Sequence, residues 1–415
     1  MTRIVLNFLA DSLFYLITPI QLNSKINYYL SHPIQYFSPL LREMNKEFDL
    51  EVYYFSDASV KGNVDVGFGR KVKWDIPLLD GYRYTFLKNL SKRKSLSNKM
   101  WDAVNPGVIK TLIQGNSSIV IVNGWSYFSN LLVIITAKLM GKKVWLRAEN
   151  PLNHELLKSK SLLAVKKLIL RIFLFPFINK FLYIGSQSKL FFKYYGAKPS
   201  QLIFTPYAVD NNWFQREAFC LKDKGRVKKE LGLPVDKEIV LFTGKYIQKK
   251  RPLDLLKAFH LMKSSTSVLV MVGEGELRKE MEGYIREYDL ENVVLTGFIN
   301  QSQIAKYYAV ADVFVMCSGV GETWGLSVNE AMNFALPVVV SETCGCADDL
   351  VHHNQNGFLF KEGDIKALSD TVKQLLENEI LRAAYGAASF QIINDFSVKR
   401  IVQNMKGAVN LECCN

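Results

Sequence analysis

Residues 320–340 read VGETWGLSVNEAMNFALPVVV, and this order of residue types predicts a loop, a short helix and then a buried strand. Pro337 marks the turn before the run of valines, which is typical of a strand covered on both faces. Glu322 lies in the loop, and Glu330 lies about one turn inside the helix. Gly325 lets the backbone approach a ligand closely, and the amides at the start of the helix can bind an anion.

The two carboxylates of this stretch predict a ligand that carries both an anionic group and hydroxyl groups. A nucleotide-sugar fits, with its diphosphate on the amides of Gly325 and Leu326. One glutamate would then bind sugar hydroxyls, and the other would bind ribose hydroxyls. The alternative is that Glu330 is a solvated residue on a helix face, because two glutamates at this spacing also occur by chance. The glycine, the tryptophan, the helix start and the following strand favour the ligand.

The length and composition indicate a globular protein of two domains. The chain has 415 residues, of which 49% are hydrophobic and 12% aromatic, which excludes a disordered chain. Its six cysteines lack the spacing of a disulfide framework, and Cys344-x-Cys346 is too tight for the usual zinc pair. We therefore expect a reduced cytoplasmic setting and no bound metal.

The positive charge of the chain is confined to its first half. The net charge of +13 divides into 28 − 13 = +15 for residues 1–210 and 24 − 26 = −2 for residues 211–415. Nucleic acid and an anionic membrane are both partners for such a surface. We expect no nucleic-acid partner, because the chain has no recognisable DNA- or RNA-binding motif and its basic residues alternate with long apolar ones.

Residues 156–180 show this mixture most clearly. They read LLKSKSLLAVKKLILRIFLFPFINK, with lysines and one arginine among leucines, isoleucines and phenylalanines at helical spacing. One interpretation is a helix that packs on its own sheet with the lysines outside. The other is a helix that lies on an anionic bilayer.

The apolar residues 1–22 form a separate segment of uncertain role. Asp11 would lie deep in the hydrocarbon if the segment spanned a membrane, and no small-residue cleavage site follows it. The segment is interpreted either as an amphipathic leader or as an extension before the start of the fold.

The remaining chain alternates strands and helices, which predicts two parallel sheets. Residues 60–100 are the exception and are predicted to be irregular. The change in charge near residue 210 indicates the domain boundary. Strands are predicted at residues 26–30, 50–55, 118–122, 143–147, 181–185, 202–205, 238–242, 267–272, 293–296, 313–317, 338–340 and 358–360.

A glycine and two lysines follow the first strand of the second half. Gly244-Lys245 comes directly after the strand at 238–242, and Lys250 precedes the next helix. A glycine turn with cations near a helix N-terminus is suited to phosphate. Either lysine alone could also be an ordinary solvated loop residue.

Taken together, these motifs resemble family 4 glycosyltransferases. The resemblance covers nearly all of residues 25–412 and is most specific between 240 and 360. It is carried by Gly244-Lys245 with Lys250, Gly273-x-Gly275, Gly297-Phe298, the run 311–315 (ADVFV), and Glu322-x7-Glu330 followed by Ala331-Met332 and Pro337-Val338.

The resemblance implies an α/β fold of the GT-B class, with two facing Rossmann-like domains. The acceptor domain would span residues 23–210 and the donor domain residues 211–390. Residues 391–415 would form a helical segment that returns to the first domain. The loop 31–36 (SHPIQY) departs from the glycine pair that many relatives have there, which leaves its contacts to the donor open.

The resemblance also implies roles for individual residues. Lys245 and Lys250 would hold the diphosphate, although Lys245 stands where arginine is commoner. Glu322 would contact the transferred sugar and Glu330 the ribose. The remaining donor contacts would come from Gly244, Gly297, Phe298, Thr323, Gly325 and Leu326.

In the first domain, Glu149 and Asn150 are candidates for the vicinity of the reacting sugar carbon, with Arg147 behind them. They follow the predicted strand at 143–147, at the end where ligands bind in parallel sheets. The alternative is that Arg147 and Glu149 form a structural ion pair.

The activity implied is retaining transfer of a sugar from a nucleotide diphosphate-sugar to a glycan or lipid-linked acceptor. The implied setting is assembly of surface polysaccharide or lipopolysaccharide, in the cytoplasm or peripherally on the inner face of the cytoplasmic membrane. No metal and no cofactor beyond the donor are expected. Two alternatives are a nucleotide-sugar epimerase of the same fold and a non-catalytic subunit that binds nucleotide-sugar.

Overall fold

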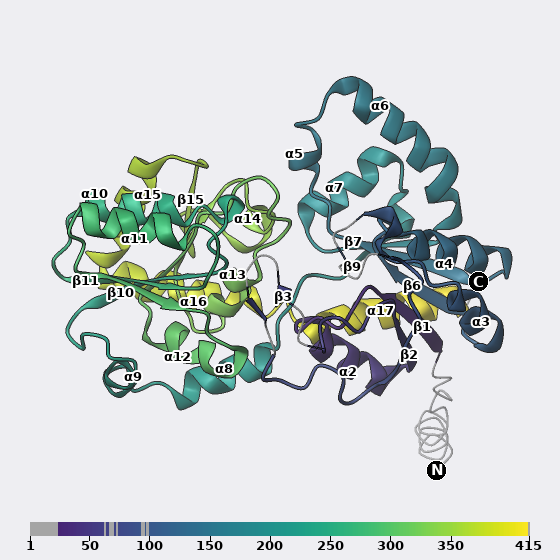
Figure 1. The fold of residues 1–415 in the computed structure, drawn as a ribbon, viewed down its shortest axis with the longest axis horizontal. Helices are drawn as coiled ribbons and strands as arrows, with labels where there is room; N and C mark the ends of the chain where they lie inside the picture. Colours follow the sequence, from purple (N-terminus) through teal and green to yellow (C-terminus); the bar gives the residue numbers. More distant parts are fainter. Residues whose placement is uncertain are drawn as a thin grey trace, which may run out of the picture.

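Two α/β domains lie side by side in the computed structural model, which describes residues 24–61, 64–65, 70–71, 74–92, 96 and 99–413 (Figure 1). Each domain has a parallel sheet between layers of helices, so the predicted fold class is confirmed. The apolar leader predicted at residues 1–22 lies outside the described residues.

The N-terminal domain is built on a seven-stranded sheet with the order β5-β2-β1-β6-β7-β8-β9. All of its pairings are parallel. Its strands are β1 (Lys25–Leu30), β2 (Asp49–Tyr54), β5 (Arg83–Phe86), β6 (Ile119–Asn123), β7 (Lys143–Ala148), β8 (Lys180–Tyr183) and β9 (Leu202–Phe204). Its helices are α2 (Phe37–Glu47), α3 (Gly107–Gln114), α4 (Phe128–Leu139), α5 (Leu152–Glu155), α6 (Lys160–Ile169) and α7 (Ser186–Tyr195).

Strand β5 corrects the prediction that residues 60–100 are irregular. It pairs with β2 at the edge of the sheet, and most of its side chains are exposed. Arg83 on β5 forms an ion pair with Asp49 and lies 3.5 Å from Glu51, both on β2. An exposed edge strand does not produce the buried apolar alternation on which strand prediction depends. A short antiparallel pair, β3 (Val64–Asp65) and β4 (Arg70–Lys71), also lies in this region.

The C-terminal domain is built on a six-stranded parallel sheet with the order β12-β11-β10-β13-β14-β15. Its strands are β10 (Glu238–Thr243), β11 (Ser267–Val272), β12 (Val293–Gly297), β13 (Val313–Met316), β14 (Val338–Ser341) and β15 (Gly357–Phe360). Its helices are α8 (Asn211–Cys220), α9 (Lys224–Glu230), α10 (Pro252–Met262), α11 (Arg278–Glu287), α12 (Gln301–Val310), α13 (Leu326–Met332), α14 (Ala347–Leu350), α15 (Ile365–Leu376) and α16 (Glu379–Ile393).

Both faces of each sheet are covered, and this explains the apolar runs in the sequence. Separate clusters of buried apolar side chains lie on the two faces of the first sheet and on the two faces of the second. Strands buried on both faces have no polar alternation, and this property made most of them predictable.

The last helix, α17 (Val398–Cys413), crosses from the second domain to the first (Figure 1). It packs along α2 and β9, and its apolar side chains join the core of the N-terminal domain. Lys406 on α17 also forms an ion pair with Glu47 at the end of α2, with 2.5 Å between Nζ and Oε2. The chain therefore connects its two domains twice, near residue 210 and again near residue 395.

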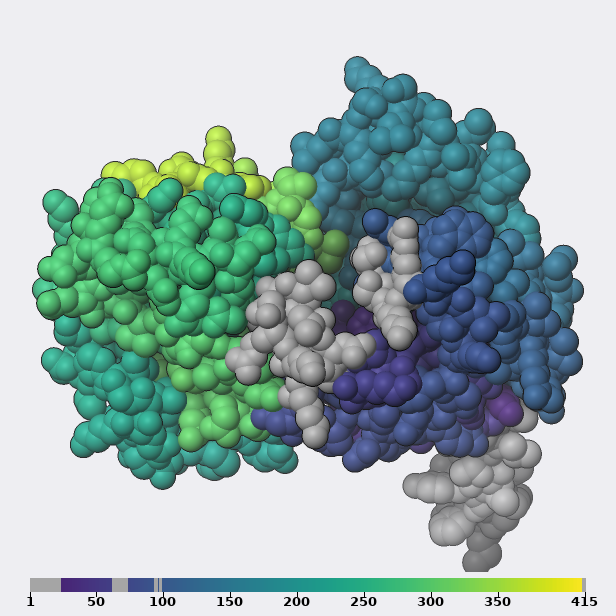
Figure 2. All heavy atoms as spheres, in the orientation of Figure 1, coloured from purple at the N-terminus to yellow at the C-terminus, as the bar shows by residue number. Residues whose placement is uncertain are grey.

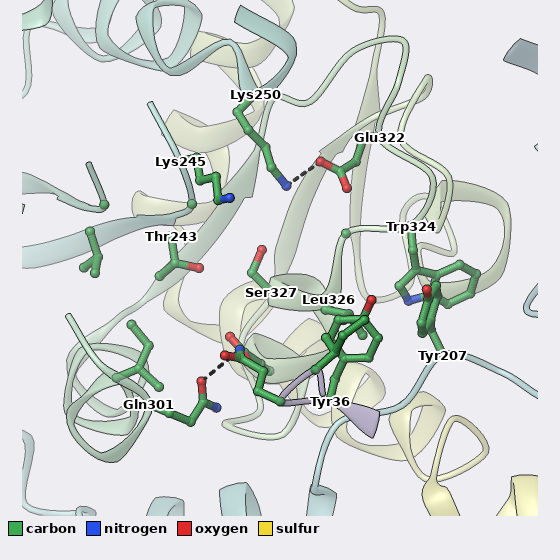
Figure 3. Close-up of a pocket in the computed structure, with 18 of the residues that line it drawn as sticks. Tyr36, Tyr207, Thr243, Lys245, Lys250, Gln301, Glu322, Trp324, Leu326 and Ser327 are labelled. Atoms are coloured by element: carbon green, nitrogen blue, oxygen red, sulfur yellow. Dashed lines mark hydrogen bonds and ion pairs between the residues drawn. The ribbon is translucent and has the colours of Figure 1, made fainter. Parts of the chain in front are cut away.

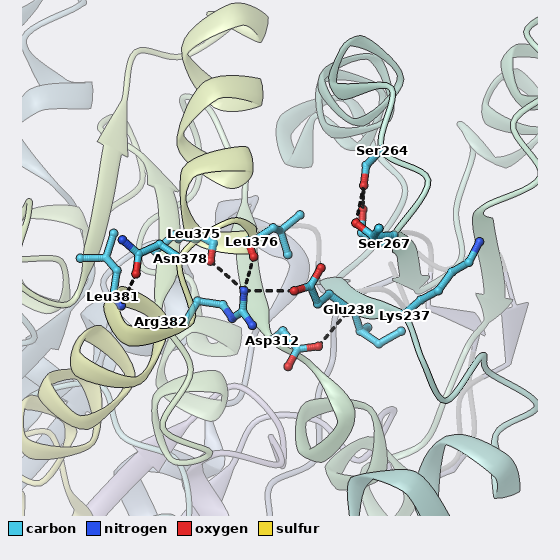
Figure 4. Close-up of polar contacts among 12 residues, drawn as sticks. Lys237, Glu238, Ser264, Ser267, Asp312, Leu375, Leu376, Asn378, Leu381 and Arg382 are labelled. Atoms are coloured by element: carbon cyan, nitrogen blue, oxygen red, sulfur yellow. Dashed lines mark hydrogen bonds and ion pairs between the residues drawn. The ribbon is translucent and has the colours of Figure 1, made fainter.

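Figure 4 shows polar contacts near the amino ends of strands of the second sheet. Arg382 on α16 lies 3.2 Å from the Glu238 carboxylate, and it also donates to two carbonyls at the end of α15. The Asp312 carboxylate accepts from the Ile239 amide at 2.8 Å and from Lys224. Asp312, which belongs to the motif of residues 311–315, therefore fastens β10 to β13.

Candidate active site

A cavity of about 610 Å³ lies between the two domains. Its walls are loops that follow the carboxyl ends of β1, β7, β9, β10, β11, β12 and β13. Parallel sheets bind their ligands at these ends. Figure 3 shows residues of both domains converging on this space.

Ten of the eleven residues predicted for the site line this cavity. They are Glu149, Gly244, Lys245, Lys250, Phe298, Glu322, Thr323, Gly325, Leu326 and Glu330. The eleventh, Gly297, ends β12 beside Phe298 but is not part of the lining, and its carbonyl accepts from the Gly273 amide at 3.0 Å. Asn150 and Arg147 are also outside the lining.

One wall of the cavity carries three lysines from a single loop between β10 and α10. Lys245, Lys249 and Lys250 all line it. Lys249 also donates to the Gly321 carbonyl at 3.3 Å, which links the lysine loop to the Glu322 loop. Sequence reasoning named only Lys245 and Lys250, although the adjacent lysine pair at 249–250 could have drawn attention to Lys249 as well.

Lys250 forms an ion pair with Glu322 at the edge of the lysine wall (Figure 3). Burial raises the pKa of Glu322, but the positive charges of Lys250 and Lys249 outweigh this effect, and hydrogen bonds from Lys250 and Ser318 add to theirs. The pKa of the Glu322 carboxyl therefore lies below its ordinary value. Glu322 is an acceptor of hydrogen bonds at neutral pH, and not a proton donor.

Gly325 ends the Glu322 loop in a conformation that requires glycine. Its φ is 112°, and a Cβ added there would lie 2.6 Å from the Met316 sulfur and 2.9 Å from the Cys344 sulfur. The close packing places the start of α13, with Leu326 and Ser327, against the cavity. The loop and short helix predicted from residues 320–332 are thus present.

Glu330 lies on α13, at the end of a chain of hydrogen bonds from Thr243 through Tyr308. The Tyr308 hydroxyl donates to its carboxylate at 2.6 Å, and Thr243 lies 2.7 Å behind Tyr308. Burial raises the pKa of Glu330 to about 7, although the hydrogen bonds from Tyr308 and Gln301 oppose the rise. Glu330 is therefore a partly protonated acceptor near neutral pH, and Gln301 is a neighbour that sequence reasoning missed.

Glu149 reaches the cavity from the opposite domain. Its carboxylate accepts a hydrogen bond from the Tyr207 hydroxyl, and burial raises its pKa against the attraction of Arg147 and a hydrogen bond from Thr323. Arg147 is buried over the rings of Phe37 and Tyr207, at 4.9 Å and 4.8 Å from their centroids. Arg147 thus lies behind Glu149, and Tyr207 is the direct partner of this carboxylate.

The loop after β1 also lines the cavity. Its residues 32–36 all contribute to the wall. The Gln35 side chain donates to Gln301 at 3.3 Å, and Tyr36 packs edge-on against Tyr207 with 5.4 Å between ring centroids. The site therefore includes an aromatic wall from the N-terminal domain that no local motif indicated.

The glycines at 273 and 275 serve packing in this structure. A Cβ at Gly273 would lie 1.8 Å from the Gly244 carbonyl oxygen, and one at Gly275 would lie 2.5 Å from the Tyr246 carbonyl oxygen. These glycines let the loops after β10 and β11 come into contact, and this contact supports the loop that carries the lysines.

The described part of the chain contains neither a metal-binding cluster nor a membrane-spanning helix. Within it, no group of three or more His, Cys, Asp or Glu side chains could hold a metal ion. In the same part of the chain, no helix has the length and apolar content needed to cross a bilayer.

Comparisons with known proteins agree with this geometry. Residues 223–391 match the family model described as glycosyl transferases group 1. The N-acetyl-alpha-D-glucosaminyl L-malate synthase of Bacillus anthracis is 26% identical over 209 residues, which are 50% of this chain and 53% of that protein. The amylovoran biosynthesis glycosyltransferase AmsK of Erwinia amylovora is 37% identical over 115 residues, which are 26% of this chain and 28% of that protein. The matched regions thus span about half or less of these relatives.

The fold is also found among solved structures. The crystal structure of Anabaena HepE in complex with UDP superposes with a TM-score of 0.71 at 17% identity, covering 93% of this chain and 99% of that one. Residues 223–391 therefore match the group 1 glycosyltransferases in sequence, and they form the greater part of one domain of a GT-B fold.

Proposed function

We propose that this protein transfers a sugar from a nucleotide diphosphate-sugar to a hydroxyl group, with retention of the anomeric configuration. The observation that carries the proposal is the composition of the cavity between the domains. Three lysines form one wall, Glu322 lies beside them in its ion pair with Lys250, and Glu330 lines the cavity from α13. This arrangement matches the charges and hydroxyls of such a donor.

The donor would lie mainly on the C-terminal domain. Its diphosphate would lie among Lys245, Lys249 and Lys250, with the amides of Gly325 and Leu326 in support. Its ribose hydroxyls would bind Glu330, whose other hydrogen bond, from Tyr308, already orients the carboxylate. The base would pack beside Phe298, where Trp74 comes within 6.2 Å between ring centroids.

The ion pair of Lys250 and Glu322 is compatible with an exchange of partners on donor binding. In the free protein each charge neutralises the other. When the diphosphate arrives, Lys250 gains a partner of higher charge, and Glu322 is released to accept hydrogen bonds from the transferred sugar. The binding energy of the donor would thus be coupled to the position of the sugar.

The chemical step would break the bond between the anomeric carbon and the β-phosphate oxygen. The acceptor oxygen would form the new bond on the same face of the sugar, and its proton would pass to the departing phosphate oxygen. The lysines would stabilise the negative charge that develops on the leaving diphosphate. No protein base is needed, because the leaving group takes up the proton.

The acceptor would enter from the N-terminal domain. Glu149 lies at that wall together with Tyr36 and Tyr207, and aromatic faces are common in sugar-binding walls of such clefts. We propose a glycan or lipid-linked acceptor of surface polysaccharide assembly, and we propose that the reaction takes place in the cytoplasm without a metal ion. The name of the Erwinia relative, a biosynthetic enzyme for amylovoran, supports this setting.

The test begins with a panel of nucleotide diphosphate-sugars, first for thermal stabilisation of the protein and then for hydrolysis or transfer. Lys250→Ala and Glu322→Gln should each lower turnover by at least about 10²-fold and keep the fold. Lys257→Ala and Glu280→Gln, which change exposed residues of the same type outside the cavity, should match wild type. Wild-type turnover in both site variants would refute the assignment.

The same experiment separates the two alternative functions. An epimerase would convert the donor sugar in the absence of any acceptor, and NMR of the incubated donor would reveal the new isomer. A non-catalytic subunit would be stabilised by a nucleotide-sugar but would show neither hydrolysis nor transfer. The group 1 match of residues 223–391 favours the transferase over both.

A further inference from the structure

An apolar stripe faces away from the protein along α6 and the turn of π-helix (Leu170–Leu174) that continues it. Leu162, Val165, Leu168, Ile169, Ile172 and Phe173 have relative exposures between 51% and 69%. They recur at the three- and four-residue intervals of one helix face. Leu156 and Leu157, immediately before the helix, are equally exposed. These eight residues are called the α6 surface below.

The opposite face of the same segment anchors it to the domain. Leu163, Leu170 and Leu174 are buried, and the last two belong to the core cluster around α4 and α7. Lys166 lies 2.6 Å from the buried Glu155 carboxylate, and Lys167 lies over the Tyr194 ring. The segment is therefore held by its inner face, and the α6 surface is left without a partner among the described residues.

This arrangement departs from the first interpretation of residues 156–180 in how many apolar side chains stay exposed. A helix that packs on its own sheet with lysines outside would bury most of its apolar residues. Here a narrow apolar face is buried and a wider one is exposed, in a segment that Figures 1 and 2 show as a projection from the N-terminal domain. Monomeric soluble proteins rarely expose contiguous apolar patches of this kind unless they bind a partner.

The charge around the α6 surface identifies the partner. Between Glu155 and Asp210 the sequence has nine Lys and Arg residues and no Asp or Glu. Lys158, Lys160 and Arg171 are exposed on the segment itself, and Lys189, Lys193 and Lys198 are exposed on and after α7, against which the segment packs. An apolar stripe flanked by these cations is complementary to an anionic lipid surface, where apolar side chains enter the acyl region and lysines meet phosphates.

We propose that the α6 surface and its flanking lysines dock the protein on an anionic lipid bilayer. Docking would be peripheral, with the stripe lying in the plane of the interface. The position of the segment adds a consequence that rests on the proposed function. Helix α5 begins three residues after Glu149, and His154 on α5 lies 2.8 Å from the Thr343 carbonyl of the other domain. The mouth of the cleft would therefore lie beside the lipid, where a lipid-linked acceptor is held.

Vesicle flotation tests the docking without any need for transferase activity. The wild-type chain should float with vesicles of phosphatidylcholine that contain about one third phosphatidylglycerol, and not with phosphatidylcholine alone. Raising the salt from about 0.1 M to about 1 M should weaken flotation, because the Debye length falls from ~10 Å to ~3 Å. Flotation that is independent of anionic lipid would refute the proposal.

The decisive variant replaces Leu162, Ile169 and Phe173 together by serine. Its flotation should fall at least about tenfold, because the apolar contribution to interfacial binding is lost. The matched control replaces Phe219, Leu261 and Ile380 by serine, which are exposed apolar residues of the C-terminal domain, and it should float like wild type. Both variants keep residues 1–22, so any lipid binding by that segment cancels in the comparison.

Three measurements keep the outcomes separate. Circular dichroism and UDP-sugar affinity should be unchanged in the triple variant, which shows that its fold and donor site persist. Equal flotation of the triple variant and wild type would refute the docking, as would a wild-type dimer in sedimentation that the triple variant abolishes while neither floats. If the protein binds anionic vesicles but turns over no donor, the proposed function is refuted and the proposed docking is supported.

Discussion

The two domains share one architecture and differ in what their surfaces offer. Among the described residues, nineteen exposed large apolar side chains lie before residue 211, six lie in the C-terminal domain, and one, Leu411, lies on α17. The charges of the two halves are +15 and −2. The C-terminal domain holds the three lysines and the two spaced glutamates that line the cavity. The N-terminal domain carries most of the exposed apolar side chains and the excess of positive charge. We infer that the C-terminal domain binds the donor and that the N-terminal domain binds the acceptor and the surface that holds it.

The largest expected effect comes from the lysine wall of the C-terminal domain. Lys250→Ala should lower turnover by about 10²- to 10³-fold, because it removes a cation from the leaving diphosphate and leaves Glu322 buried without its ion-pair partner. The measurement is kcat for donor hydrolysis or transfer. Lys160→Ala in the N-terminal domain is the contrast, and it should leave kcat on a water-soluble acceptor unchanged. Comparable losses of kcat in both variants would contradict the assignment of donor binding to the C-terminal domain.

A smaller effect is expected from Glu149, the carboxylate that the N-terminal domain contributes. Glu149→Gln should lower kcat by about 10- to 100-fold, because the charge next to the reacting sugar is lost. Donor affinity should stay within about twofold, since the donor rests on the other domain. Titration of UDP-sugar by calorimetry checks the second point. A large loss of donor affinity with unchanged kcat would place Glu149 in the donor site instead.

Glu330 should make donor binding depend on pH. Its pKa is raised to about 7, so the carboxylate that accepts ribose hydrogen bonds is increasingly protonated as the pH falls from 8 to 6. Donor affinity should therefore fall by several-fold over this interval in wild type, and Glu330→Gln should be weaker at pH 8 but nearly independent of pH. A wild-type affinity that does not change between pH 6 and pH 8 would contradict this role.

The same pKa has a consequence for stability, and the sign is opposite to that of an ordinary buried salt bridge. Because the folded pKa lies above the unfolded value of about 4.5, the folded state binds more protons between these values, and the contribution of Glu330 to stability is lost as the pH rises through 7. Thermal denaturation should show Glu330→Gln to be more stable than wild type by a few degrees at pH 8 and by less at pH 6.

The contact between the domains can be tested at Gly185. A Cβ there would lie 2.5 Å from the Asp349 carboxylate and 2.5 Å from the Trp324 ring, both in the C-terminal domain. Gly185→Ala should therefore push the domains apart and reduce turnover by a few-fold, with a small fall in Tm. Gly107→Ala is the control, because its nearest neighbour would be 4.0 Å away. Small-angle scattering should show an increased separation only in Gly185→Ala.

The smallest effect is expected from chelation. Excess EDTA should leave turnover unchanged, because the lysines supply the positive charge that a divalent cation would otherwise bring to the diphosphate. A loss of activity that Mg²⁺ or Mn²⁺ restores would show that the lysine wall is not sufficient.

The sequence alone determined the features that depend on near neighbours in the chain. Most strands were predictable because burial on both faces leaves an uninterrupted apolar run, as at 238–242 and 267–272. Ten of the eleven predicted site residues reached one cavity because parallel strands deliver their loops to the same edge of a sheet. Strand β5 was not predicted because most of its side chains are exposed, so its sequence lacks the apolar pattern of a buried strand.

Only the tertiary structure decided which groups meet across the chain. It joined Tyr207 to Glu149 over 58 positions and Lys250 to Glu322 over 72, distances at which no local pattern operates. It also decided which side chains of residues 156–180 are buried and which are exposed. Periodicity reveals that a helix has apolar faces, but the room on the underlying domain determines which of them is covered. Here Leu163 and Leu170 are buried, Leu170 within the core of the N-terminal domain, and the wider face around Ile169 stays exposed.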